Sequence, residues 1–431
     1  MSDQEQEPKH GRTGVELFAG GGGLAMAVHR AGFRPLLVNE YAPRACQTLE
    51  ANGAKPRAKD DETIPQPGDP WPLVAGDVRE VRFRHLEGKV DVLAGGPPCQ
   101  PFSLGGVHKG DEDERNMFPQ MFRAIREIRP KAVICENVRG LLRPSFKPYF
   151  DYIQRELAFP FVERRTGASW QEHDAILSGL DDQKVGDPSE HYRVVMTPVN
   201  AADYGVPQIR NRVIMVAFRS DLNVDVDAFK KAVEPQFSES ALIRSMLIDG
   251  PDSYWQRHSV APHIREAVLN RLPGTIPLDD GKRPWRTLRD AIAGIDGATP
   301  LPPIPDELLD RQEHKLGGFT DHIGWPGARI YQGHTPNELD RPAKTVKAGV
   351  HGVPGGESVM LLDSKHPTDD PKYRYMTVRE TARVMTFPDD WKLEGPRGEK
   401  MRQLGNAVPV LLGQVFAKAV AKALDDVECA R

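Results

Sequence analysis

The chain has few cysteines and no long apolar run, and these two absences exclude several classes of protein. Its four cysteines (Cys46, Cys99, Cys135 and Cys429) lie far apart with no paired spacing. This spacing argues against a disulfide framework or a zinc site and favours a reducing compartment. No apolar stretch approaches the roughly 20 residues of a membrane span, and the polar N-terminus does not resemble a signal peptide. We therefore expect a cytoplasmic protein with no membrane partner.

A strong excess of either charge is absent as well. The formal net charge is -4, which argues against general coating of nucleic acid but leaves room for a local basic cleft. Internal repeats and long low-complexity segments are also lacking. The 431 residues, 39% hydrophobic and 27% charged, are typical of a globular protein of two or three domains.

Short apolar runs alternate with segments of helical spacing in the first half of the chain. This alternation predicts an α/β fold, a doubly wound and mostly parallel sheet with helices on both faces. The predicted strands are 15–18, 35–39, 90–93, 131–135, 193–199 and 212–218, and the predicted helices are 24–31, 42–52, 117–128, 378–385 and 411–424. The polar residues 164–191 show no clear period and are interpreted as a surface excursion.

Changes of composition along the chain predict where its domains begin and end. Residues 1–11 are predicted to be a disordered tail and 12–220 an α/β domain. Residues 221–376, rich in Pro, Gly, Trp and His, predict a second, smaller and irregular domain. Helical spacing returns in 377–431.

A glycine turn follows the first predicted strand. Gly20, Gly22 and Ala25 satisfy the G-x-G-x-x-A pattern, and Glu40 ends the next strand, where a carboxylate can bind ribose hydroxyls. The pattern indicates an adenosine-containing cofactor: a nicotinamide, a flavin or S-adenosylmethionine. Asp77, after the third strand, could accept a hydrogen bond from an adenine amino group or be a turn residue.

The segment Gly95-Gly96-Pro97-Pro98-Cys99-Gln100-Pro101-Phe102-Ser103 places a cysteine on a loop that prolines stiffen at a strand end. A thiol held there can be a nucleophile, although a lone cysteine in a turn is more often inert. Glu136 ends the next strand, so both side chains are expected at one sheet edge. Arg210 and Arg212 are two apart on an extended segment and are expected to point the same way.

Taken together, these segments resemble the cytosine-carbon-5 DNA methyltransferases. The resemblance rests on ordered motifs that cover 14–218 and 341–423: Phe18-Ala19-Gly20-Gly21-Gly22-Gly23, Pro97-Pro98-Cys99-Gln100-Pro101-Phe102-Ser103, Glu136-Asn137-Val138, Gln208-Ile209-Arg210-Asn211-Arg212, Arg341-Pro342-Ala343-Lys344-Thr345-Val346 and Gly405-Asn406-Ala407-Val408-Pro409. It implies a fold of the S-adenosylmethionine-dependent methyltransferase type. The catalytic and cofactor-binding domain would be 12–220, the target-recognition domain 221–376, and 377–431 a hinge and return to the catalytic domain.

The resemblance also implies roles for individual residues. Cys99 would add to cytosine carbon 6, Glu136 would hydrogen-bond the ring, and Arg212, with Arg210 nearby, would hold the carbonyl oxygen. The cofactor S-adenosylmethionine, with no metal, would contact Phe18, Gly20, Gly22, Gly23, Leu24, Glu40, Asp77, Val78, Pro98, Asn406 and Val408. DNA would contact Gln100, Ser103, Arg115, Arg341 and Thr345. Residues 105–118 would close over the DNA, and 164–191 has no counterpart.

The implied partner is double-stranded DNA, whose target cytosine must leave the helix to be reached. A restriction endonuclease of the same target site is a further partner that the resemblance suggests, and we expect a monomer. Three alternatives stay open at this stage: a tRNA cytosine-5 methyltransferase on the same scaffold, a non-catalytic DNA-binding relative, and a nicotinamide oxidoreductase.

Overall fold

The structure is a computed structural model that describes residues 11–98, 116–248, 250, 253–295, 297–305, 307, 318–330, 332–347 and 356–430. The chain forms two compact units. Unit 1 comprises Met1–Val199, Asn211–Glu234 and Gly413–Arg431, and unit 2 comprises Asn200–Arg210 and Pro235–Leu412. Cys99 and the rest of the predicted loop to residue 115 lie outside the described residues.

Unit 1 is built on a sheet that has eight strands among the described residues. The order is β3-β4-β2-β1-β5-β6-β8-β7. The strands are β1 (Arg12–Leu17), β2 (Phe33–Glu40), β3 (Lys55–Pro56), β4 (Pro72–Ala75), β5 (Val92–Gly95), β6 (Ala132–Val138), β7 (Tyr192–Asn200) and β8 (Asn211–Arg219). Pairs from β3 to β6 are parallel, and β8 runs antiparallel to β6. The predicted fold class, a doubly wound and mostly parallel sheet, is confirmed.

The order of the strands fixes where a ligand can bind. From β1 the chain first builds outward through β2 to β4, and then crosses to β5 and β6 on the other side of β1. The direction of winding therefore reverses between β1 and β5. In open α/β sheets ligands bind beyond the carboxyl ends of the strands at such a switch point.

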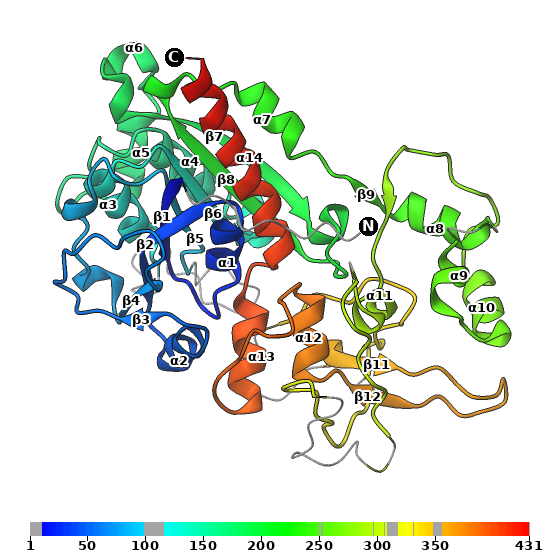
Figure 1. Cartoon of the computed structure of the whole chain (residues 1–431). Helices are drawn as coiled ribbons and strands as arrows, with labels where there is room; N and C mark the ends of the chain where they lie inside the picture. The colour runs from blue at the N-terminus through cyan, green and yellow to red at the C-terminus, as the bar shows by residue number, and fades with distance from the viewer. Residues whose placement is uncertain are drawn as a thin grey trace. The chain divides into compact units, whose positions relative to one another are not determined.

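Helices cover both faces of this sheet (Figure 1). The helices of unit 1 are α1 (Gly23–Arg30), α2 (Pro43–Ala51), α3 (Phe118–Ile128), α4 (Lys147–Ala158), α5 (Trp170–Leu177), α6 (Asp182–Val185), α7 (Val226–Ala232) and most of α14 (Val410–Cys429). On one face α3, α4 and α5 form the largest core with side chains such as Leu17, Leu93 and Cys135. On the other face α1 and α7 pack, the latter through Phe229 against Phe218.

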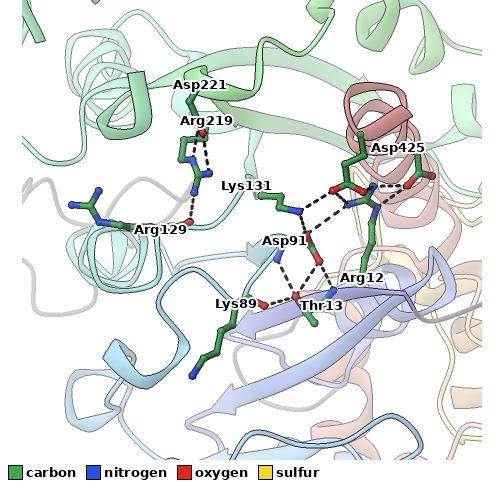
Figure 2. Close-up of polar contacts among 10 residues, drawn as sticks. Arg12, Thr13, Lys89, Asp91, Arg129, Lys131, Arg219, Asp221 and Asp425 are labelled. Atoms are coloured by element: carbon green, nitrogen blue, oxygen red, sulfur yellow. Dashed lines mark hydrogen bonds and ion pairs between the residues drawn. The ribbon is translucent and has the colours of Figure 1, made fainter. Parts of the chain in front are cut away.

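A charged network holds the amino ends of the strands (Figure 2). Asp91, before β5, accepts the backbone N–H of Thr13 at 2.8 Å and contacts the Lys131 ammonium at 2.8 Å. Arg12 and Lys131 both reach Glu428 of α14, at 3.0 and 2.9 Å. These contacts tie the C-terminal helix to the amino edge, opposite the carboxyl edge where open α/β sheets bind ligands.

Unit 2 contains more regular structure than its composition suggests. Its elements are β9 (Phe237–Ser238), α8 (Glu239–Leu247), α9 (Tyr254–His258), α10 (Pro262–Leu269), β10 (Arg283–Pro284), α11 (Leu288–Ala293), β11 (Val359–Leu361), β12 (Tyr373–Tyr375), α12 (Val378–Val384) and α13 (Arg397–Asn406). A small core around Tyr254 and Trp255 unites α8 to α10. The Tyr254 hydroxyl donates to Asp340 at 2.8 Å, and Arg289 binds the same carboxylate at 2.6 Å. These polar bonds tie that small core to Asp340 and to α11, which carries Arg289.

Two expectations need correction. Residues 164–191 are not simply a surface excursion, because α5 packs on α4 and buries His173 and Leu177. The stretch Arg397–Cys429 is long and apolar enough by composition to cross a membrane, contrary to the sequence analysis, but 72% of its apolar window is buried in the protein. A core helix passes the same test of length and composition.

Candidate functional site

The glycine turn predicted to bind a cofactor joins β1 to α1 at the switch point. Phe18, Gly20 and Gly22 have positive φ angles of 58°, 55° and 91°. Glycine adopts such angles at little cost, whereas Phe18 does so only because the surrounding fold imposes it. A Cβ on Gly95 would lie 2.8 Å from the Leu17 carbonyl oxygen, so β5 approaches β1 closely only because Gly95 has no side chain.

Glu40 fixes this turn from the end of β2. One carboxylate oxygen accepts the Gly20 N–H at 2.6 Å and the other accepts the Ala42 N–H at 2.6 Å. Burial raises the pKa of Glu40, while these N–H bonds oppose the rise. Since Gly20 has open space where a Cβ would stand, the arrangement offers a fixed carboxylate beside a turn that a ligand can approach at Gly20.

Glu16, on β1, is a buried titratable residue that the sequence reasoning did not assign. It is 4% exposed, and its Oε2 has no hydrogen-bond partner in the described part of the chain. Burial raises its pKa well above the ordinary value of 4.5. In the unfolded chain this carboxyl ionises above that value, whereas the folded chain keeps the proton. The native state then binds one proton more, so stability falls as pH rises from 4.5 toward the raised pKa.

Glu16→Gln should therefore stabilise the cofactor-free protein more at pH 8 than at pH 5, since glutamine cannot ionise. Each kcal/mol gained in the free energy of unfolding raises the melting temperature by about 2–4 °C in a unit of this size. Thermal unfolding of both proteins at the two pH values measures the difference. Parallel pH profiles would show that Glu16 is solvated or paired in the folded state.

The other residues predicted to bind the cofactor have varied surroundings. Asp77 caps a 3₁₀ turn by accepting the Arg79 N–H at 2.9 Å and lies 3.4 Å from Nε of that arginine. Gly23 begins α1, and Leu24 and Val78 are buried. In unit 2, Asn406 is exposed at the end of α13 and Val408 is buried.

The catalytic residues expected at the ends of β5 and β6 are partly described. Glu136 is 8% exposed, and a Cβ on Gly96 would lie 3.4 Å from its Oε2. The Asn137 side-chain amide donates to the Pro97 carbonyl at 3.0 Å, a role that the motif alone did not reveal. The segment that leads to Cys99 therefore starts beside Glu136 and is held there by Asn137.

Arg212 completes this group from β8. Its Nε lies 2.8 Å from Oε1 of Glu136, and the two side chains are 13% and 11% exposed. The antiparallel register pairs Val138 with Arg212, which brings the guanidinium alongside the end of β6. A partly desolvated carboxyl and guanidinium in contact hold each other's orientation.

Arg210 has surroundings of another kind. It is fully buried, and its guanidinium donates to the carbonyl oxygens of Val346, Gly405 and Ala407 at 2.9, 2.8 and 2.9 Å. The two arginines thus share no partner among these contacts, and the expectation that they point the same way does not hold. Arg210 instead joins the segment 341–346 to the end of α13 within unit 2.

The residues predicted to contact DNA are only partly described. Arg341 pairs with Glu239 at 2.6 Å, and the Thr345 hydroxyl donates to the Ile209 carbonyl at 2.7 Å. Gln100, Ser103 and Arg115 lie outside the described residues, and Pro98, the last residue before that gap, is exposed.

The described cysteines differ from what a nucleophile requires. Cys46 is buried, and burial together with Glu40 and Glu50 raises the pKa of its thiol to about 12. Cys135 is part of the core on β6, and Cys429 is exposed near the end of α14. Since the thiolate is the reactive form, the first two are unsuited to attack a substrate. Within the described ranges, no group of three His, Cys, Asp or Glu side chains could hold a metal ion.

Comparisons with known proteins agree with this arrangement. The model of the C-5 cytosine-specific DNA methylases matches residues 13–159 and 183–422. The Type II methyltransferase M.PspPI of Psychrobacter sp. (strain TA137) is 31% identical over 97% of this chain and 81% of its own length. M.NgoMIV of Neisseria gonorrhoeae, also a Type II methyltransferase, is 30% identical over 96% of this chain and 98% of its own.

A solved E. coli structure, described as a prophage-encoded DNA modification methyltransferase, covers 96% of this chain and 99% of its own at 19% identity, with a TM-score of 0.54. That likeness concerns the fold. The family model spans both the glycine turn and the Glu136–Arg212 pair. The chain therefore belongs to the C-5 cytosine-specific DNA methylases and is a DNA cytosine-5 methyltransferase.

Proposed function

We propose that this enzyme transfers the methyl group of S-adenosylmethionine to carbon 5 of a cytosine in a specific duplex DNA sequence, through a covalent adduct with Cys99. The contact of Glu136 with Arg212 beside Gly96 carries the proposal. Gly96 precedes Cys99 by three residues, so the carboxyl of Glu136 and the cation of Arg212 lie beside the segment that leads to the cysteine. They lie at the edge where this class of sheet binds ligands.

The glycine turn fits the cofactor. The open space at Gly20 admits a ligand close to the backbone, and both oxygens of Glu40 are oriented by N–H donors while keeping lone pairs for ribose hydroxyls. Phe18, Leu24, Asp77, Val78, Asn406 and Val408 are the further residues that we propose to hold it. S-adenosylmethionine supplies an electrophilic methyl group when bound.

The protein's own residues supply the remaining chemistry. Carbon 5 of cytosine is a weak nucleophile, so the Cys99 thiolate bonds to carbon 6 and makes carbon 5 enamine-like. A proton held between Glu136 and ring nitrogen 3 neutralises the negative charge that develops there, and Glu136 also accepts from the exocyclic amine. Arg212 orients Glu136 and holds the carbonyl oxygen. After methylation, a solvent water takes the proton from carbon 5, and the electrons of that bond expel the thiolate and leave 5-methylcytosine. Arg210 does not contact the base in this mechanism. It stabilises unit 2 through its hydrogen bonds to the carbonyls of Val346, Gly405 and Ala407.

The base has to leave the duplex to meet Cys99, at a cost of roughly a few kcal/mol. We propose that Gln100, Ser103, Arg115, Arg341 and Thr345 take part in the DNA contacts that offset this cost. The two relatives are Type II methyltransferases, which supports a restriction-modification role, with a cognate endonuclease that shares the target site. We further propose that the enzyme acts as a monomer in the bacterial cytoplasm.

Expression in a host that lacks cytosine methylation tests the substrate. We expect bisulfite sequencing of the host DNA to show protection of one short sequence on both strands, with host tRNA unmodified. Methylated tRNA with unmodified DNA would instead assign the enzyme to RNA. A host in which neither polymer changes would overturn the proposal.

A further inference from the structure

Residues 160–182 are an insertion that the family model does not match, yet the structure gives them a defined place in unit 1. Helix α5 starts with a capping box, in which the Ser169 side chain and Glu172 each accept the other's backbone N–H. Arg155 of α4 binds both carboxylate oxygens of Asp174 at 2.7 and 2.8 Å. The side chain of Leu177 lies in the main core. The insertion is therefore firmly packed on α4.

One aromatic side chain of the insertion contacts two tyrosines of α4. The ring of Trp170 lies 5.2 Å from that of Tyr149, edge to face at 80°, and 5.6 Å from that of Tyr152. Such pairs of rings prefer these offset and edge-on geometries. The Tyr149 ring is also 94% buried, so its hydroxyl has little freedom to move.

The two tyrosine hydroxyls have different partners. Tyr152 lies 3.1 Å from Nδ1 of His173, whose Nε2 donates to the Val162 carbonyl at 2.7 Å. Burial lowers the pKa of His173, which is consistent with a neutral ring and Nδ1 as acceptor. Tyr152 is thus tied to the insertion and, within α4, to the buried carboxyl of Glu156.

Tyr149 points instead to the segment that carries the catalytic cysteine. Its hydroxyl accepts the side-chain amide of Asn116 at 2.5 Å, and both residues are buried. The adjacent Met117 N–H donates to the Pro98 carbonyl at 3.1 Å. Pro98 and Asn116 are the described residues on either side of 99–115, so these two bonds hold the chain where that segment leaves and where it returns.

We propose that Trp170 and Tyr149 are positioning residues for methyl transfer: the insertion fixes Tyr149, Tyr149 fixes Asn116, and the position of Asn116 and Met117 against Pro98 sets how well Cys99 is presented to the base. The inference rests on the proposed role of Cys99. A mutation far from the chemistry that misplaces a reacting group by about 1 Å can slow an enzyme by about a hundredfold. A chain of buried contacts that ends beside the nucleophile's segment is therefore able to control the rate.

Tyr149→Phe tests the proposal, because it deletes one hydroxyl and keeps the ring. We expect the single-turnover rate of methyl transfer to fall about tenfold, since the buried Asn116 amide loses its acceptor. Cofactor affinity should stay within about twofold, because Glu40 and the glycine turn are untouched. Tyr152→Phe is the matched control: it deletes a similarly buried hydroxyl that faces His173, and should keep the rate.

Two further measurements separate positioning from general packing. Trp170→Ala should slow transfer as Tyr149→Phe does, and Trp170→Phe should restore much of the rate at a temperature well below unfolding. Asn116→Ala combined with Tyr149→Phe should be no slower than the slower single variant, because both remove the same bond.

Equal rates for wild type and Tyr149→Phe would overturn the inference, as would equal slowing by Tyr149→Phe and Tyr152→Phe. A 5-fluorocytosine oligonucleotide distinguishes this failure from that of the proposed function. If wild type and Tyr149→Phe form the conjugate equally fast, only the positioning role is ruled out. If wild type forms no conjugate with a proven target and cofactor, the role of Cys99 falls and the positioning role with it.

Discussion

Cys99→Ser should reduce methyl transfer by about 10⁴-fold or more. A serine hydroxyl is a far weaker nucleophile than a thiolate at neutral pH. Cofactor binding should persist, because the carboxylate of Glu40 and the glycine turn that it fixes are unchanged. Single-turnover transfer to a duplex oligonucleotide measures the first effect and equilibrium binding of the cofactor the second.

The sulfur's role has a direct chemical readout as well. Fluorine at carbon 5 of the target cytosine cannot leave as a proton does, so the final expulsion of the thiolate is blocked and the enzyme stays joined to the oligonucleotide. Peptide mapping should find that bond at Cys99. Cys429→Ser, at the exposed cysteine of α14, is the control and should form the conjugate at the wild-type rate. A conjugate at any other residue would contradict the mechanism.

Much of unit 1 was predictable because its signals are local. Runs such as Val92-Leu93-Ala94 are apolar on both faces, as a buried parallel strand requires, and positive φ angles at Gly20 and Gly22 need glycine. The carboxyl ends of neighbouring parallel strands meet at one edge whatever their sequence. The proximity of Gly96 to Glu136 follows from that geometry.

The parts that could not be predicted depend on distant contacts. Arg210 precedes the first residue of β8, so strand alternation does not apply to it, and its three acceptors lie 136 to 197 residues away in the chain. The helix α5 has only eight residues, and its buried face, with Trp170 and Leu177 seven positions apart, is too short to show a period within the polar stretch around it. The burial of Glu16 could not be predicted from the sequence, because a carboxylate in a strand is ordinarily expected to face water.

Glu136→Gln should slow single-turnover transfer by about 10²- to 10³-fold, since a preorganised group that stabilises developing charge typically contributes this much. The amide is nearly the same size, so the strand and its register should survive. It also leaves the Arg212 guanidinium, 13% exposed, without its charged partner. Arg212→Met should slow transfer for the complementary reason, because Glu136 then loses the contact that orients it.

The double variant distinguishes a functional pair from two independent sites. Because the two groups touch at 2.8 Å, their effects should not add, and the double variant should be little slower than the slower single one. Arg219→Gln is a matched control, since Arg219 forms an ion pair of 2.7 Å with Asp221 at the other end of β8 (Figure 2). It should lower the melting temperature slightly and keep the rate. Additive losses for Glu136 and Arg212 would mean that the ion pair between them is not what organises the site.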